Sequence, residues 1–242
     1  MSIRNCRLEP GQREMPEKAR AILAAVVFLL VAGTAMVGVP VPAAAQVSLL
    51  PDEVERIDVI AIEIDDRDVF AFDALSGRRS RLRLEIGEKV YFSESRGRVG
   101  LLLTDRRALG IAPGIDFQET RYRIQEGIPE VGLIEDRIAL VVTGRRALGF
   151  VGASGWIEER FSPQESAEAL RVGAAAGIVA TNRRALGLAP DGVSFVSTNF
   201  RIKEKLESVS AQDTLVSVRT NRRILVFSAP RSFWTAQDRT LN

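Results

Sequence analysis

The sequence predicts an all-β fold built from a repeated unit, and three observations support this prediction. The segment TDRRALG at 104–110 returns as TGRRALG at 143–149, TNRRALG at 181–187 and TNRRILV at 220–226. Within one period of about 39 residues, four short apolar runs alternate with turn signals such as Pro190-Asp191-Gly192. No part of the repeats contains a helical stripe of about ten or more residues.

The unit at 167–201 shows the expected strands most clearly, at 167–174, 176–181, 184–189 and 195–201. One period before Thr104 lies Asp65, in AIEIDDRDVFAF, which fits the same template with acidic residues. Four strands in such a period resemble a β-propeller blade, although no motif of a particular propeller subfamily is present. The resemblance implies a five-bladed β-propeller of four-stranded antiparallel blades over residues 46–242.

Burial patterns suggest a role for each strand. The strand before each Arg pair is apolar on both faces (VGLLLT, IALVVT, AGIVAT), which predicts that it is the innermost strand of its blade. The following polar-apolar strands are expected further out. Each begins with an aromatic residue that we expect to pack between blades rather than to bind a sugar: Phe117, Trp156, Phe195, and Phe233 or Trp234.

The N-terminal end of the repeats is expected to close the ring. Pro51–Asp58 aligns, one period earlier, with a predicted outer strand at 90–97. Counted after Thr214, the last blade has only three strands, so the N-terminal segment would supply the missing one and remove a free sheet edge.

The heptad itself predicts a tight hairpin followed by a packing strand. Thr104 and Arg107 flank a two-residue turn, whose first position is held in the five units by residues that tolerate positive φ: Asp66, Asp105, Gly144, Asn182 and Asn221. The small residues that follow would let neighbouring blades approach closely: Ala108, Gly110, Ala147, Gly149, Ala185 and Gly187.

The repeated arginines form two columns. The first, at the second turn position, is a candidate binding collar around one end of the propeller: Arg67, Arg106, Arg145, Arg183 and Arg222. Either these residues pair with acidic residues of neighbouring blades, or they bind a carboxylate, a phosphate or an acidic partner. The second column contains Asp68, Arg107, Arg146, Arg184 and Arg223.

Two charged residues interrupt otherwise apolar strands. Glu63 replaces the Leu or Val of the other units, and Arg219 replaces a residue that is apolar in units two to four. Because units one and five become neighbours in a closed ring, we expect Glu63 and Arg219 to meet as a buried structural pair at the seam. Asp68, in a column otherwise made of arginine, is a second candidate for a seam contact.

Residues 1–45 have the features of an export signal. Arg13, Lys18 and Arg20 precede an uncharged run from Ala21 to Val39, and Ala43 and Ala45 suit a signal-peptidase site. Translation could start at Met15. An uncleaved membrane anchor is the alternative. Either form predicts a periplasmic or secreted bacterial domain, or one anchored in the inner membrane and facing the periplasm.

Composition narrows the possible functions. Residues 1–45 hold five of the 33 Lys and Arg and three of the 31 Asp and Glu, so 28 of each sign remain in the rest of the chain. This balance argues against nonspecific nucleic-acid binding. The chain lacks His, and its single Cys6 precedes the apolar run, so we expect no metal site, cofactor or disulfide in the exported domain.

The sequence therefore favours an exported, non-catalytic binding or scaffolding propeller that holds a protein or glycan, with a membrane involved only through the leader. A monomer is expected. The alternative is a small glycan-directed lyase or hydrolase with an acid near Glu63, but no second carboxylate with suitable spacing supports it.

Overall fold

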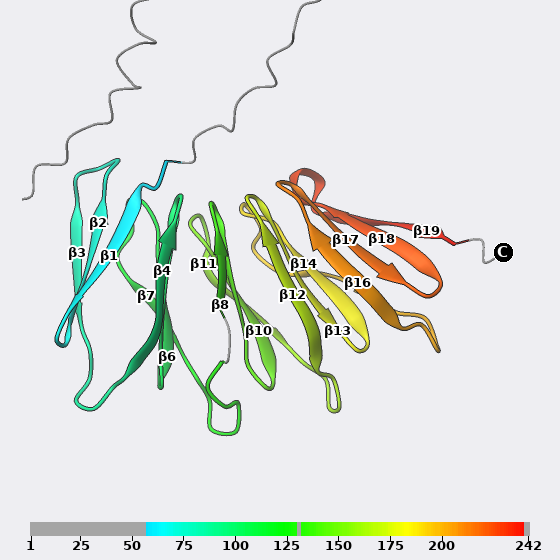
Figure 1. Cartoon of the computed structure of the whole chain (residues 1–242), viewed down its shortest axis with the longest axis horizontal. Helices are drawn as coiled ribbons and strands as arrows, with labels where there is room; N and C mark the ends of the chain where they lie inside the picture. The colour runs from blue at the N-terminus through cyan, green and yellow to red at the C-terminus, as the bar shows by residue number, and fades with distance from the viewer. Residues whose placement is uncertain (1–56, 130–131, 240–242) are drawn as a thin grey trace, which may run out of the picture. The chain divides into compact units, whose positions relative to one another are not determined.

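A computed structural model of the chain describes residues 57–129 and 132–239 (Figure 1). The chain divides into residues 1–50 and 51–242, and all described residues belong to the second unit. The predicted leader and most of Pro51–Asp58 therefore lie outside the described residues. The described part is all-β apart from one short 3-10 helix, η2 (Ala229–Arg231). Its strands form five antiparallel sheets, in agreement with the predicted repeat architecture.

The sheets follow one another in chain order. The first has three strands, β1 (Ile60–Asp65), β2 (Asp68–Asp73) and β3 (Arg79–Arg83). The second contains β4 (Val90–Arg96), β5 (Val99–Thr104), β6 (Arg107–Ile111) and β7 (Gln118–Arg121). The third contains β8 (Gly132–Glu135), β9 (Ile138–Val142), β10 (Arg146–Val151) and β11 (Gly155–Arg160).

The last two sheets repeat this pattern. The fourth contains β12 (Ala167–Gly173), β13 (Ala176–Thr181), β14 (Arg184–Leu188) and β15 (Val196–Asn199). These bounds lie close to the strands predicted for the unit at 167–201. The fifth contains β16 (Leu206–Ala211), β17 (Leu215–Thr220), β18 (Arg223–Ser228) and β19 (Phe233–Asp238).

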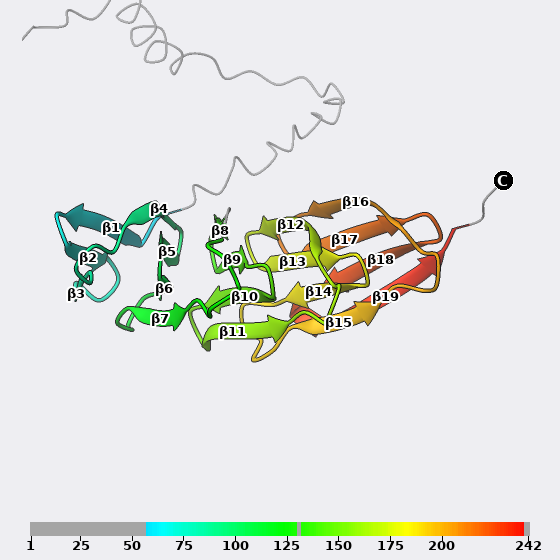
Figure 2. The same cartoon turned by 90° about the horizontal axis from the view of Figure 1, so that it is seen from below.

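The strand before each Arg pair is the second of its sheet, so the prediction that it is innermost is wrong. In the second sheet the order is β4-β5-β6-β7, and β5 and β6 are buried along their whole length. Their burial on both faces results from a central place in the sheet and from cover by the neighbouring sheets. In Figure 2 the first strands β4, β8, β12 and β16 lie along one side and the fourth strands along the other.

The prediction of a strand missing from the last sheet is also wrong. The fifth sheet is complete from residues 206–238, because β16 precedes Thr214, and the three-stranded sheet is the first. Asp58 does not reach the last sheet, since its carboxylate accepts the Gly97 N–H of the second sheet at 2.6 Å. Closure of the ring by the segment before Asp58 stays a prediction.

Backbone hydrogen bonds join successive sheets just before the strands β1, β5, β9 and β13. The N–H groups of Val59, Arg98, Arg137 and Ala175 donate to carbonyl oxygens in the turn of the next sheet. At Arg98 the acceptor is the carbonyl of Asp136, at 2.7 Å. The spacing of the donors follows the sequence period, so the repeat specifies sheet-to-sheet contacts as well as the sheets themselves.

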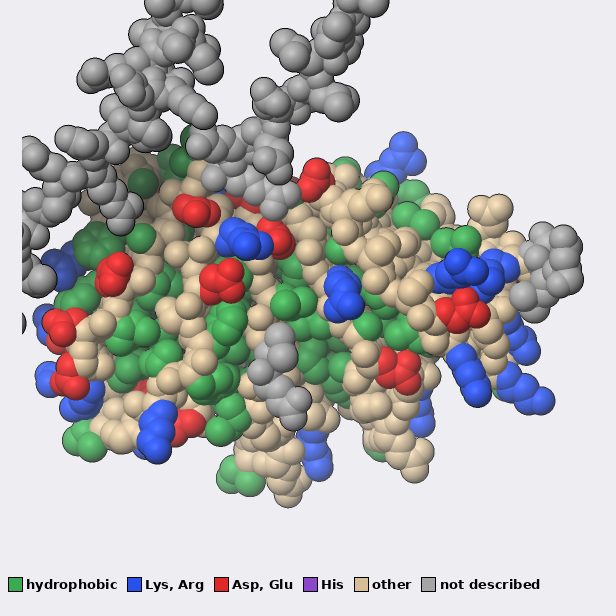
Figure 3. Space-filling model, viewed as in Figure 1, with side chains coloured by type: hydrophobic (Ala, Val, Ile, Leu, Met, Phe, Trp, Pro, Cys, Tyr) green, Lys and Arg blue, Asp and Glu red, His purple; other side chains and the backbone are tan. Residues whose placement is uncertain are grey.

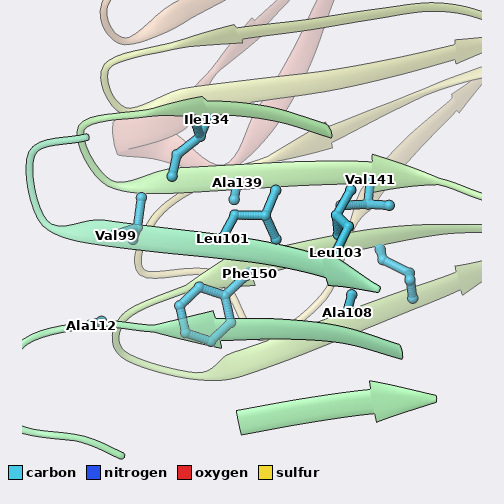
Figure 4. Packing of buried hydrophobic residues seen from close by; sticks show 10 residues of the cluster. Val99, Leu101, Leu103, Ala108, Ala112, Ile134, Ala139, Val141 and Phe150 are labelled. Carbon is cyan, nitrogen blue, oxygen red and sulfur yellow. The ribbon is translucent and has the colours of Figure 1, made fainter. Parts of the chain in front are cut away.

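The small residues of the heptad allow the close approach that was predicted. A Cβ atom added to Gly110 of β6 would lie 2.3 Å from the ring of Phe150, which belongs to the third sheet. Gly149 is covered in the same way by Leu188, and Gly187 by Phe227. Phe150 is fully buried in a cluster that joins the second and third sheets (Figure 4). Each glycine thus receives a large side chain of the following sheet.

The aromatic residues at the start of the fourth strands pack between sheets, as expected. Trp156 lies 5.3 Å from Phe150 between ring centroids, and its Nε1–H donates to the Gln118 carbonyl of the preceding sheet. Trp234 makes the same two contacts with Phe227 and the Val196 carbonyl. Among the residues that the structure describes, no helix is long and apolar enough to cross a membrane.

Candidate functional site

One end of the sheets, here called the hairpin end, collects the repeated arginines. It consists of the Thr-Arg hairpins at 104–107, 143–146, 181–184 and 220–223, together with the connecting segments 83–89, 121–128, 160–166 and 201–205. Because each sheet is antiparallel, every connecting segment lies at the same end as the hairpin between its second and third strands. This end is at the lower side of Figure 1.

Each hairpin is held by its threonine. Thr104 Oγ1 accepts the N–H groups of Arg106 and Arg107, at 3.1 and 3.0 Å, so the hydroxyl closes the turn. Among the first turn residues only Asp66 has a positive φ, of 52°, and the prediction of positive φ is therefore wrong for the other four.

The Asp and Asn residues at that position have another role. The Asp105 carboxylate accepts the Lys89 N–H, and the Asn182 and Asn221 side chains accept the N–H groups of Ser166 and Lys205. All three acceptors bind the start of the sheet to the hairpin. Their short polar side chains are required for these contacts rather than for a left-handed backbone.

The second arginine column is neutralised by glutamates, and its members are buried except for half-buried Arg184. Arg107, Arg146, Arg184 and Arg223 pair with Glu88, Glu126, Glu165 and Glu204, at 2.9, 3.0, 2.8 and 2.7 Å. Thr104, Thr181 and Thr220 donate to the same carboxylates at 2.8, 2.9 and 2.6 Å. We call each set of Thr, Glu and second Arg a clasp.

Three of the four clasps also connect two sheets. The Nη2 groups of Arg146, Arg184 and Arg223 donate to carbonyl oxygens in the fourth strand of the preceding sheet, those of Arg121, Arg160 and Asn199. The glutamate comes from the connecting segment, and the threonine and arginine come from the hairpin. One buried ion pair therefore fixes the hairpin, the connecting segment and the preceding sheet together.

The clasp glutamates also cap the turns that carry them. Glu88 accepts the Glu85 N–H at 2.8 Å, and Glu126, Glu165 and Glu204 accept the N–H three residues earlier. The residue before each glutamate has a positive φ: Gly87, Gln125, Gln164 and Lys203. We did not identify these glutamates from the sequence, although Glu88, Glu165 and Glu204 each stand 16 residues before the repeated threonine.

The clasps alter the acidity of their carboxyl groups. Burial alone would raise the pKa of Glu204, but hydrogen bonds from Arg223, Thr220 and the Arg201 N–H outweigh it and lower the pKa to about 2. Glu88 has the same balance of effects and a pKa of about 2, and the pKa of Glu165 is also lowered. All three groups are therefore charged at neutral pH.

We predict that the domain loses stability in acid through the clasps. The folded-state pKa values of Glu88 and Glu204 lie below the unfolded value of 4.5, so their stabilisation is complete above about pH 5 and is lost as pH falls toward 2. Each contributes about 3 kcal/mol. Urea unfolding at pH 7, 4 and 2.5 measures the loss, and an unfolding free energy unchanged at pH 2.5 would contradict it.

The first sheet has no clasp within the described residues. Asp68 stands in place of the second arginine and pairs with Arg81 of its own sheet at 2.6 Å, so the seam contact proposed for Asp68 is not the contact it makes. Arg67 donates to the Leu84 carbonyl at 2.6 Å. The residue one period before Glu88 lies outside the described residues.

The first arginine column divides into paired and unpaired members. Arg106 pairs with Glu85 at 2.7 Å, and Arg67 is half-buried. Arg145, Arg183 and Arg222 are exposed, and their guanidinium groups have no partner among the described residues. The alternative that the column pairs with acids fits Arg106, while the other three remain available for a ligand.

A hollow at the third sheet brings additional cations to Arg145. It is lined by Arg123, Ile124, Glu126, Arg145, Arg160 and Phe161. Glu126 is neutralised by buried Arg146, and Arg123 lies 3.6 Å from Glu158. The hollow thus combines an excess of guanidinium groups with an exposed apolar side chain.

Glu63 and Arg219 are both exposed, so the burial expected of this pair is wrong. Arg219 instead pairs with Glu207 at 3.1 Å. Each residue lies on the face of its strand opposite the buried side chains, which are Ile60 in β1 and Val216 and Val218 in β17. Their meeting across a seam stays a prediction. In the part of the chain that the structure covers, no group of three or more acidic, Cys or His residues could hold a metal ion.

No protein-family model and no curated protein matches this chain. Solved β-propeller structures are similar to it. Yeast RCC1 (Prp20), crystallised with Kap60, matches with a TM-score of 0.38 and 7% identity over 71% of this chain and 54% of that one. Hsv2 of Kluyveromyces lactis matches with a TM-score of 0.37 and 9% identity, over 76% of this chain and 62% of that one.

The extracellular domain of the putative one-component system BT4673 from B. thetaiotaomicron gives a TM-score of 0.35 and 10% identity, over 76% of this chain and 26% of that one. The chain spans little more than half the length of the RCC1 structure. At these TM-scores the matches say nothing about ligands. The chain resembles β-propeller repeat proteins, as its period and strand pattern predict.

Proposed function

We propose that this chain is an exported, non-catalytic binding or scaffolding protein whose hairpin end holds an anionic partner. The observation that carries the proposal is the difference between the two arginine columns. The second column is buried, apart from half-buried Arg184, and each arginine is paired with its clasp glutamate. Arg145, Arg183 and Arg222, in contrast, are exposed and have no partner among the described residues. A rigid scaffold that presents unpaired guanidinium groups is suited to carboxylates or phosphates.

The clasps support this proposal because they fix the turns that carry the exposed arginines. Arg145 directly precedes Arg146, whose side chain is 2% exposed and pairs with Glu126. An arginine on a fixed backbone loses less freedom when it binds than one on a mobile loop. Export is proposed from the leader sequence alone. Closure into a five-bladed ring is also proposed, and a cross-link between residues 63 and 219 would test it.

Affinity capture from the extracytoplasmic fraction tests the binding surface. Three baits are compared: the natural chain, the variant Arg145→Ser/Arg183→Ser/Arg222→Ser, and a control variant with the same loss of charge at the opposite end, Arg98→Ser/Arg171→Ser/Arg231→Ser. We expect the first variant to lose acidic partners that the control retains. Equal capture by all three baits would show that these arginines do not form the site.

A further inference from the structure

Each connecting segment presents an apolar side chain at its tip. The tip residue is the second in the glutamate-capped turn, namely Ile86, Ile124, Pro163 or Ile202. The three isoleucines are 82%, 95% and 87% exposed. They follow the sequence period, so the same kind of side chain is presented in the same way at successive sheets.

Packing within the domain does not explain why isoleucine occupies these three positions. At such exposure a side chain packs against almost nothing, and a turn tip ordinarily favours polar residues or proline. Each tip is nevertheless held in place, because the clasp glutamate two residues later caps its turn. At Ile202, for example, Glu204 accepts the Arg201 N–H at 2.5 Å and pairs with buried Arg223. The tips therefore do not fold back on the protein.

The same segments carry a large excess of positive charge. Their clasp glutamates are buried and neutralised, and the one remaining acid in these segments, Glu85, pairs with Arg106 and Arg121. Around the tips stand Arg83, Lys89, Arg121, Arg123, Arg160, Arg201, Lys203 and Lys205. Arg121, Arg123 and Arg201 also contact strand carboxylates, those of Glu119, Glu158 and Asp238, and the other five have no ion pair among the described residues. Basic and apolar side chains occur together along the lower edge of Figure 3. The residues after position 45 are balanced in charge as a whole. The hairpin end is therefore basic because positive and negative side chains are unevenly distributed over the domain.

We propose that the hairpin end docks on the surface of an anionic lipid bilayer, with the isoleucine tips entering the interface and the Lys and Arg residues contacting lipid phosphates. The proposal rests on the proposed function, since it names the anionic partner. A bilayer is favoured because the tips are highly exposed and lie on different connecting segments. A protein would need one pocket for each tip, whereas a fluid surface accepts them all and adds attraction to anionic headgroups.

Vesicle sedimentation of residues 46–242, which include the whole compact second unit, tests this proposal. Vesicles of phosphatidylcholine alone are compared with vesicles that also contain phosphatidylglycerol. We expect binding only to the anionic vesicles. The variant Ile86→Ser/Ile124→Ser/Ile202→Ser should bind at least about tenfold more weakly, because three apolar side chains no longer leave water. Its thermal unfolding and its retention on heparin, a soluble polyanion, should be unchanged.

The control is Leu75→Ser/Val193→Ser, which removes exposed apolar side chains at the opposite end and should bind vesicles as the natural chain does. A second readout is Ile124→Trp, whose added fluorescence should shift to the blue with anionic vesicles. Vesicle binding by the isoleucine variant at natural strength, or no binding by the natural chain, would overturn the proposal. If heparin retention then still depends on Arg145, Arg183 and Arg222, the partner is a soluble anion; if it does not, the proposed function fails too.

Discussion

Replacing Glu204 by Gln is expected to lower the free energy of unfolding by about 3–5 kcal/mol. The side chain of Glu204 is fully buried and that of Arg223 is 9% exposed, and both nitrogens of the guanidinium that face Glu204 bond to it. Glutamine keeps the shape but removes the charge, so Arg223 is left as a buried cation without an acidic partner. Arg223 is the most sensitive choice because Arg107, Arg146 and Arg184 each have a second glutamate.

Urea unfolding at pH 7 measures this loss, and Glu207→Gln is the matched control. Glu207 is an exposed partner of Arg219 and Arg239 in the same sheet, and an exposed pair contributes little. A Glu204→Gln variant as stable as Glu207→Gln would show that the clasp is not a source of stability. The double variant Glu204→Gln/Arg223→Met should be more stable than Glu204→Gln alone, because it removes the unpaired charge.

Replacing Phe150 by Ala is expected to destabilise the domain by about 3–5 kcal/mol. Phe150 is fully buried and lies over Gly110 of the neighbouring sheet, so alanine leaves a cavity between the second and third sheets. Gly110→Val is also expected to destabilise, because its side chain would occupy the space of the Phe150 ring.

The combination of the two changes tests the contact itself. In the double variant Gly110→Val/Phe150→Ala, the valine fills part of the cavity, and we expect the loss to be at least about 1 kcal/mol smaller than the two single losses together. Urea unfolding of the four proteins gives this coupling. Strictly additive losses would mean that Gly110 and Phe150 do not interact across the sheets.

The sequence predicted the parts of the fold that are local and repeated. A two-residue hairpin after an apolar strand determines that the two flanking strands pair with each other. The small residues of the heptad mark the contact that Gly110 makes with Phe150. The place of each strand was harder to predict. Burial on both faces is compatible with the edge or the middle of a sheet, and only the observed order places β5 second.

The candidate site shows more clearly what could not be predicted from the sequence. Arg106 and Arg107 are adjacent and chemically identical, yet one lies in the turn and the other begins β6 and is buried. What separates them is Glu88, which comes from a different segment and becomes their neighbour only in the folded chain. A sixteen-residue spacing between a repeated glutamate and a repeated threonine was the signal that could have revealed it. The exposed isoleucines gave no signal, because apolar residues in a β-rich sequence are first assigned to the core.

The central claim is that adjacent arginines of one heptad differ in role, the second joining the sheets and the first binding anions. Elution from heparin in a salt gradient tests it most directly. We expect Arg145→Ser/Arg183→Ser/Arg222→Ser to elute at clearly lower salt than Arg98→Ser/Arg171→Ser/Arg231→Ser, which carries the same net charge, with thermal unfolding unchanged in both. Elution of the two variants at the same salt concentration would contradict the account.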